Sequence, residues 1–269
     1  MITFTLLEQL RSLAWCNQRT LYNLITQNAW DTVNTFSQND KKLQGGAAAI
    51  TVLHTHNRRL DYHPHVHLVM PAAAINTRQR VLRNKEGNYL FNHKALAKVF
   101  RAKMLADIRK AGLKFPDKYP EEWGVDCTQV GSGQTALVYL GRYLYRGVIQ
   151  EKDILACNNG QVTFRYQNSK TKQMETRTVM GAEFVRMILQ HILPRHYRRA
   201  RNFGFLHPNS KWGALVQLKL KRTPVPAATK PRPTIRCKCC GGVMQIIRTR
   251  IKSAANWLRT PFVAGKFTV

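Results

Sequence analysis

The chain has 269 residues, enough for a substantial core, and 44% of them are hydrophobic, which excludes a disordered polar tail. Its 43 Lys and Arg residues outnumber 14 Asp and Glu residues, and the net charge of +29 indicates a polyanionic partner such as DNA or RNA. An anionic membrane surface is the alternative, but the sequence shows no long apolar run or basic amphipathic helix that favours it. The N-terminal segment lacks the basic start of a signal peptide, so we expect a cytoplasmic protein.

The first half of the chain predicts helices and hairpins in alternation. Residues 5–38 predict helix, because large apolar residues recur there at intervals of three and four. After Gly45-Gly46, residues 47–56 predict a strand, and a polar turn connects it to an apolar strand over 63–70. The segment "RVLRNKEGNYLF" predicts a second hairpin with its turn near Gly87-Asn88, and residues 93–112 predict an amphipathic helix.

The second half continues with mixed helices and strands, and from residue 207 its composition becomes basic and rich in proline. A short strand is predicted at "WGVDCTQV", a helix at "QTALVYLGRYLYRGVI", a hairpin around Asn159-Gly160, a strand at "TRTVM" and a helix near 182–193. We therefore expect an α+β fold with a largely antiparallel sheet. The predicted parts are a domain over 1–206 with a helical lead-in at 1–40, a basic proline-rich linker over 207–235, and a small cysteine-containing tail over 236–269.

Histidines gather in two neighbouring predicted strands. In "LDYHPHVHLVMP", His63, His65 and His67 occupy alternate positions, so a strand places all three on one face. If residues 47–56 pair with 63–70 through a symmetric turn, His54 lies opposite His65 and His56 opposite His63, with Cβ atoms about 5 Å apart. A single histidine is usually an ordinary surface or core residue. A face-matched set instead predicts a divalent metal, with an open coordination position typical of a catalytic site.

Two tyrosines share one face of a predicted helix downstream. In "VYLGRYLYRG", Tyr139 and Tyr143 lie one turn apart, between Arg142 and Arg146. Helical tyrosines are usually half-buried packing residues. Beside positive charge and a metal-polarised phosphate, however, a phenol with an ordinary pKa of about 10 can become a nucleophile. The sequence therefore offers two candidate nucleophiles.

These motifs resemble those of a known superfamily. His65-Val66-His67 matches the HUH motif of endonucleases that initiate rolling-circle replication and transposition. The runs "VLHTH", "LDYHPHVHLVMP" and "YLGRYLYRGVI" resemble the rolling-circle insertion-sequence transposases of the ninety-one type, in which a Tyr-x-x-x-Tyr helix follows the histidines. The resemblance runs from near residue 1 to about 205 and implies an HUH-endonuclease-like central antiparallel sheet flanked by helices.

The resemblance implies a metal site built from histidines. His65 and His67, with His54 as the third ligand, would hold Mg²⁺ or Mn²⁺, which polarises a scissile phosphate. His63 and His56 would lie outside this ligand set in supporting positions.

The resemblance also implies the reaction and its partner. Tyr139 or Tyr143 would cleave single-stranded DNA at insertion-sequence ends and targets, leaving a 5′-phosphotyrosine link whose reversal on another strand completes transposition. Arg142 and Arg146 would contact this DNA. A protein of this kind would work in the bacterial cytoplasm, associated with the nucleoid through its DNA.

The sequence departs from that family in four places. His56 stands where the family tends to have tryptophan, and Tyr145 where histidine is common. Ala72, Ala73 and Ala74 stand where the family has a glycine-rich stretch, and no cysteine-rich zinc module precedes the predicted helical start. A catalytically inactive, truncated DNA-binding remnant is therefore the alternative function, and a metal-free nucleic-acid packaging protein is a third hypothesis. In the tail, Cys237 and Cys240 form half of a tetrahedral zinc site, so Zn²⁺ binding and unliganded thiols are both retained as interpretations.

Overall fold

The chain forms two compact units, Met1–Thr223 and Pro224–Val269. The computed structural model describes residues 1–87, 90–116, 118–131, 133–145, 148–168, 171–220, 235–237 and 239–244. Within these ranges the side chains of residues 139, 140, 142–145, 220 and 235 are not described. Among the described helices, none combines the length and the apolar composition needed to cross a membrane.

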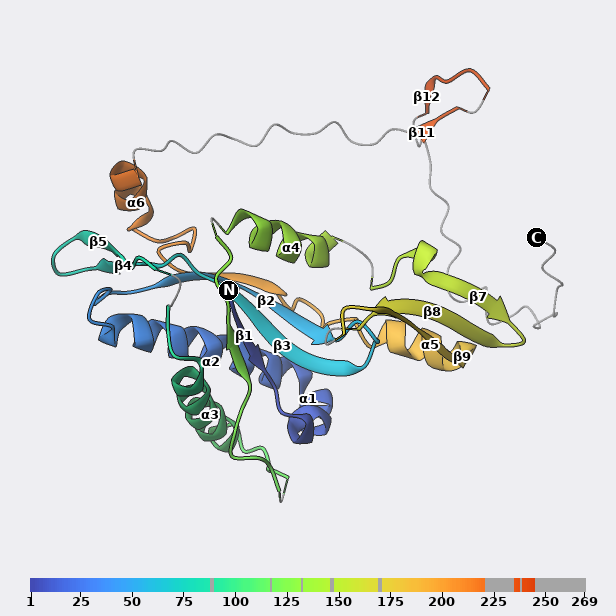
Figure 1. The fold of residues 1–269 in the computed structure, drawn as a ribbon, viewed down its shortest axis with the longest axis horizontal. Helices are drawn as coiled ribbons and strands as arrows, with labels where there is room; N and C mark the ends of the chain where they lie inside the picture. The colour runs from blue at the N-terminus through green and yellow to red at the C-terminus, as the bar shows by residue number, and fades with distance from the viewer. Residues whose placement is uncertain are drawn as a thin grey trace. The chain divides into compact units, whose positions relative to one another are not determined.

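A five-stranded sheet forms the centre of the first unit (Figure 1). Its strands follow the order β10-β2-β3-β1-β6, and every neighbouring pair is antiparallel. The strands are β1 (Ile2–Thr5), β2 (Ala48–His56), β3 (Tyr62–Val69), β6 (Val125–Cys127) and β10 (Ala200–Gly204). The predicted α+β class with a largely antiparallel sheet is therefore confirmed.

One face of this sheet packs against helices and holds the main core. In α2 (Gln18–Asn39), buried apolar residues recur at intervals of three and four, as the sequence pattern predicts. They pack against α3 (His93–Lys110) and against sheet residues such as Phe4, Leu53 and Val66, which are all at most 1% exposed. The short helices η1 (Glu8–Leu10) and α1 (Arg11–Cys16) lead into α2. This layer determines which side chains of each strand point away from the core.

The opposite face of the sheet carries α4 (Gln134–Tyr145), which lies on the other side of the sheet from α2 and α3 in Figure 1. Ala136 of α4 is 5% exposed and packs against Val52 and Val69 of the sheet. Since alternate residues of a strand share a face, Val52 lies on the same face as His54, and Val69 on the same face as His67. The start of α4 therefore rests on the histidine-bearing face.

The remaining elements of the first unit confirm one predicted hairpin in detail. Strands β7 (Ile154–Asn158), β8 (Gln161–Gln167) and β9 (Met174–Met180) form a separate sheet, preceded by η2 (Glu151–Asp153) and followed by α5 (Gly181–Leu189). The turn between β7 and β8 is formed by Asn159 and Gly160, with φ angles of 50° and 74°. Asn and Gly tolerate this left-handed conformation, which explains why the dipeptide was informative.

The helix predicted over 5–38 is found as η1, α1 and α2, which run from Glu8 to Asn39 with a break at Asn17, but the helical lead-in predicted from residue 1 is wrong at its start. Ile2–Thr5 is a strand that pairs with β3 on one side and with β6 on the other, so it lies inside the sheet. The predicted helical lead-in at 1–40 therefore contains a central strand. A four-residue strand is too short to show a period that could be distinguished from helix, and its pairing partners lie far away in the chain.

The hairpin predicted near Gly87 is also wrong. β5 (Val81–Asn84) pairs with β4 (Ala73–Asn76), which precedes it, and the turn falls at residues 77–80. The three alanines are part of this arrangement, since Ala74 is fully buried in the core. Glycine is required nearby at Gly45, where a Cβ atom would lie 2.5 Å from the carbonyl oxygen of Ile75.

The linker predicted over 207–235 begins later in the structure. α6 (Gly213–Leu220) belongs to the first unit, because Leu215 and Val216 pack with Trp212 against Ala48 and Ile75. The sequence analysis missed this helix because it is only eight residues long and its apolar residues show no clear helical period. Residues 221–234 lie outside the described part of the chain, so that portion of the linker stays a prediction. In the second unit, β11 (Ile235–Arg236) pairs with β12 (Val243–Met244).

Candidate metal centre

The hairpin of β2 and β3 sets the positions of the histidines. His54 lies opposite His65, as the sequence predicts. His56, however, lies opposite Tyr62 rather than His63, because β3 contains one extra residue at this point. Pro64 lies within the extra stretch and has no amide hydrogen to donate to the ladder, which favours a bulge there. The predicted pairing of His56 with His63 is therefore wrong.

Three histidines come together on the face of the sheet opposite the main core. His54, His65 and His67 each offer a ligand atom, and these atoms all lie within 4.8 Å of one another. The ring centroids are 5.1 Å apart for His54 and His65, 4.5 Å for His54 and His67, and 5.0 Å for His65 and His67. In the part of the chain that the structure describes, this is the one group of three potential metal ligands of these residue types.

Neighbouring groups orient two of these rings. The Nδ1 atom of His65 lies 2.6 Å from the carbonyl oxygen of His63, and the Nδ1 atom of His67 lies 3.0 Å from the Thr3 hydroxyl. A carbonyl oxygen only accepts, so Nδ1 of His65 must donate and its lone pair must reside on Nε2. This contact between a backbone carbonyl and the second ring nitrogen is the one that metal-binding histidines commonly make. The donor set thus fits a divalent ion.

Burial keeps the three imidazoles neutral at physiological pH. Desolvation, together with the neighbouring His67, His65 and Arg199, lowers the pKa of His54 to about 2. Burial likewise lowers the pKa of His65 to about 3 and the pKa of His67 to about 4. Neutral imidazole is the form that binds a metal, because protonation removes the lone pair. Three neutral donors on one face can therefore coordinate an ion and leave further coordination positions open.

The other two predicted histidines lie outside this group. The Nδ1 atom of His63 accepts a hydrogen bond of 2.8 Å from the Arg11 guanidinium. The ring of His56 stacks on His191 at a centroid distance of 3.7 Å and an interplanar angle of 22°. Burial also lowers the pKa of His56, to about 3. His63 thus supports the group through its backbone carbonyl, and His56 belongs to a separate histidine pair.

Sequence reasoning missed Thr3, Arg11, His191 and Arg199, which all lie close to these histidines. Recognising Ile2–Thr5 as a strand would have found Thr3, since Thr3 pairs directly with His67. Arg199 donates to the carbonyl oxygen of His191 at 3.4 Å, and its charge contributes to lowering the pKa of His54 and of His56. It precedes β10 in the chain, and no local pattern connects it with the histidines.

The predicted nucleophiles lie on a helix whose backbone is described. Tyr139 and Tyr143 are residues of α4, and the helix contacts β3, which carries two of the three histidines. The side chains of Tyr139, Tyr143 and Arg142, and the whole of Arg146, lie outside the described part of the protein. Their roles therefore stay predictions.

The two cysteines of the predicted zinc half-site flank a tight turn in the second unit. The Cys237 amide donates to the carbonyl oxygen of Gly242 at 2.9 Å, and the Gly241 amide donates to the carbonyl oxygen of Cys237 at 3.0 Å. Hydrogen bonds from the backbone of Cys240 and Cys239 lower the pKa of the Cys237 thiol, which favours the thiolate. Zinc binding by Cys237 and Cys240 stays a prediction.

Comparison with known proteins identifies relatives by sequence. The model of the family Y2_Tnp, described as "Putative transposase", matches residues 48–211. The chain is 27% identical over 241 residues to "Putative transposase y4qJ" of Sinorhizobium fredii (strain NBRC 101917 / NGR234), covering 81% of this chain and 61% of that protein. It is 30% identical over 176 residues to "Transposase for insertion sequence element IS801" of Pseudomonas savastanoi pv. phaseolicola, covering 57% of this chain and 42% of that protein. The chain thus spans less than two thirds of the length of these relatives.

A solved structure shows only a weak likeness. The "Conjugative Relaxase TrwC in complex with mutant OriT Dna" matches with a TM-score of 0.37 and 12% sequence identity, covering 73% of this chain and 67% of that one.

Proposed function

Because the chain belongs to the Y2_Tnp transposase family, we propose that it cleaves and transfers single-stranded DNA through a tyrosine nucleophile at a metal site. The observation that carries this proposal is the group of His54, His65 and His67 on the face of the sheet where α4 packs. The net charge of +29 supports DNA as the partner, since phosphate neutralisation provides most sequence-independent affinity.

The three histidines would hold Mg²⁺ or Mn²⁺ through neutral imidazole nitrogens, with His65 oriented by the carbonyl oxygen of His63 and His67 by Thr3. A divalent ion in that position would polarise a phosphodiester and offset the negative charge that develops during attack. Arg199, beside His54, adds a fixed positive charge that also favours a bound phosphate. These residues bind and orient the substrate.

The packing of α4 supports Tyr139 and Tyr143 as the nucleophiles. Among the described side chains of α4, Ala136 is buried against Val52 and Val69. Positions 139 and 143 follow it at spacings of three and seven residues, which lie on one side of an α-helix. This helical spacing supports the proposal, which requires positions 139 and 143 on the same side of α4 as Ala136.

In the proposed reaction, one phenol loses its proton to solvent and its oxygen attacks the phosphorus atom. The new Tyr–O–P bond forms as the bond between phosphorus and the 3′ oxygen breaks, and that oxygen takes up a proton. The products are a 5′-phosphotyrosine and a free 3′-hydroxyl. A 3′-hydroxyl on another strand can reverse the step, which transfers the strand. Two tyrosines permit two consecutive cleavages while the first covalent end is retained.

A covalent-adduct assay tests this proposal. Labelled single-stranded oligonucleotides from the ends of the encoding element are incubated with the protein and Mn²⁺, and SDS-resistant adducts are resolved on a gel. We expect an adduct that is lost in the double variant Tyr139→Phe/Tyr143→Phe and in His65→Asn. Tyr119→Phe and His93→Asn, placed away from the histidine group, are the matched controls and should retain it.

Two results would contradict the proposed chemistry. One is an adduct that survives the loss of both tyrosines of α4. The other is no adduct on any element end while DNA binding persists, which would instead support the inactive DNA-binding alternative. Binding of Mn²⁺, measured by calorimetry on the same variants, separates a lost ligand from a lost nucleophile.

A further inference from the structure

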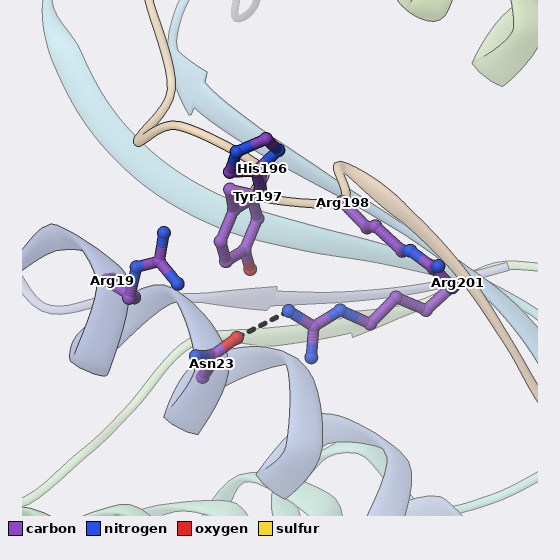
Figure 2. Close-up of a pocket in the computed structure, with 6 residues that line it drawn as sticks. All are labelled: Arg19, Asn23, His196, Tyr197, Arg198 and Arg201. Atoms are coloured by element: carbon purple, nitrogen blue, oxygen red, sulfur yellow. Dashed lines mark hydrogen bonds between the residues drawn. The ribbon is translucent and has the colours of Figure 1, made fainter.

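A second positively charged site lies at the edge of the sheet, away from the histidine group. A cavity of about 240 Å³ lies between α2 and the segment that leads into β10, and Figure 2 shows the residues that line it. It is lined by Arg19, Asn23, His196, Tyr197, Arg198 and Arg201. Three of these six residues carry a permanent positive charge and none is acidic, so the cavity concentrates uncompensated positive charge.

The alternation of β10 places this cavity on the opposite side of the sheet from the histidines. Ala200 packs with Val52 and Val69 on the histidine-bearing face. The next residue, Arg201, therefore points to the other side, where it donates a hydrogen bond to the side-chain oxygen of Asn23 on α2 (Figure 2). The cavity is thus separate from the proposed metal site.

Neutral acceptors hold two of the arginines and leave donors available. Arg201 lies over the ring of Tyr197, with 5.1 Å from the guanidinium carbon to the ring centroid, and Tyr197 donates to the backbone oxygen of Tyr22 at 2.9 Å. Arg19 donates to the backbone oxygen of Arg195 at 2.5 Å. A guanidinium has five N–H donors, and these contacts use few of them. The arginines are therefore held in place without losing their charge to a carboxylate.

We infer that this cavity binds a backbone phosphate of DNA that flanks the strand handled at the histidine face. The planar guanidinium matches the geometry of a phosphate oxygen pair, and Arg19 and Arg198 are exposed, so a polymer can reach the cavity from solvent. Three guanidinium groups line the cavity, so we expect it to contact the phosphate rather than a base, and such a contact does not depend on the DNA sequence. The inference rests on the proposed function insofar as DNA is taken as the polyanion.

The test compares two variants that each remove two positive charges. Arg19→Gln/Arg198→Gln alters the cavity and leaves Arg201, which ties β10 to α2. Arg78→Gln/Arg80→Gln alters two exposed arginines in the turn between β4 and β5. Binding of a fluorescein-labelled oligonucleotide is measured by anisotropy over a series of salt concentrations in EDTA, so that neither metal nor cleavage contributes.

We expect the cavity variant to bind DNA about tenfold more weakly than the control variant at low salt. The slope of log affinity against log salt should also fall by about 0.7 to 1 relative to the control, as expected for one lost phosphate contact. Melting temperatures establish that both variants fold. If the double variant does not, Arg198→Gln alone is compared with Arg78→Gln alone.

Equal affinities and slopes for the two variants would overturn the inference. The inference would also be overturned if inorganic phosphate raised the melting temperature of the parent but not of the cavity variant, while the cavity variant bound DNA as tightly as the control variant. The cavity would then bind a small anion and not DNA. Loss of DNA binding in the cavity variant of a protein that forms no covalent adduct would support this site and contradict the proposed chemistry. If the protein forms a covalent adduct but the two variants bind DNA with equal affinity and equal salt slope, the proposed chemistry would be supported and this site contradicted.

Discussion

Acidification should destabilise the metal-free protein through His54. This side chain is 8% exposed, and burial together with neighbouring positive groups lowers its pKa from 6.5 to about 2. In the unfolded chain His54 returns to its ordinary pKa of about 6.5. Between these two values the unfolded state binds a proton that the folded state does not. The contribution of His54 to stability is therefore fully present above pH 6.5 and falls as the pH decreases below that value.

The magnitude follows from the distance below the ordinary pKa. At pH 5.0, an unfolded histidine is about 1.5 pH units below that value, and each unit corresponds to about 1.4 kcal/mol. His54 alone should therefore lower the free energy of unfolding by about 2 kcal/mol between pH 7.5 and pH 5.0. His65 and His67, whose pKa values are also lowered by burial, should add to this loss.

Urea denaturation in EDTA at both pH values measures this effect. The parent should lose about 2 kcal/mol more than His54→Leu, which keeps an apolar side chain of similar size but cannot titrate. His93→Gln, at the exposed start of α3, serves as the control and should lose as much as the parent. An equal loss in His54→Leu and the parent would refute the reasoning, because His54 would then not be held neutral by burial.

Three further predictions concern the metal, the sheet edge and α4. Mn²⁺ at 100 times its dissociation constant should raise the free energy of unfolding of the parent by about 2.7 kcal/mol and leave that of His65→Asn unchanged. If denaturation curves show that Mn²⁺ stabilises both proteins equally, His65 is not a ligand. Gly204→Ala should cost more than about 3 kcal/mol in thermal or urea unfolding, since φ is +62° and a Cβ would lie 1.9 Å from the Ala47 carbonyl oxygen. Gly213→Ala, with open space around it, is the matched control, and similar losses would contradict this steric account. Ala136→Glu should reduce the yield of the covalent adduct at least tenfold, because it buries a charge between α4 and the sheet, while Mn²⁺ affinity stays within twofold. Thr135→Glu, on the exposed side of the helix, is the control and should retain full yield. Equal yields for the two variants would show that the packing of α4 plays no part in the reaction.

Local patterns explain what could be predicted about the fold. The Asn159-Gly160 turn, the helix over 93–112 and the pairing of His54 with His65 were all predicted, because turn chemistry and side-chain alternation act over a few residues. The failures occur where pairing is long-range or irregular. β4 is a four-residue strand with weak local signal, so its pairing with β5 was missed.

The sequence by itself determined the candidate donors, since alternation requires His65 and His67 to share a face and a hairpin places His54 across from them. Only the tertiary structure decided which groups support them. The bulge at Pro64 places Tyr62 rather than His63 opposite His56, whose ring stacks on His191. The insertion of Ile2–Thr5 beside β3 brings Thr3 to His67. The arginine cavity likewise exists only because β10 joins the edge of the sheet and faces α2. Such contacts join residues far apart in the chain, and burial of both sheet faces, rather than any local period, selects them.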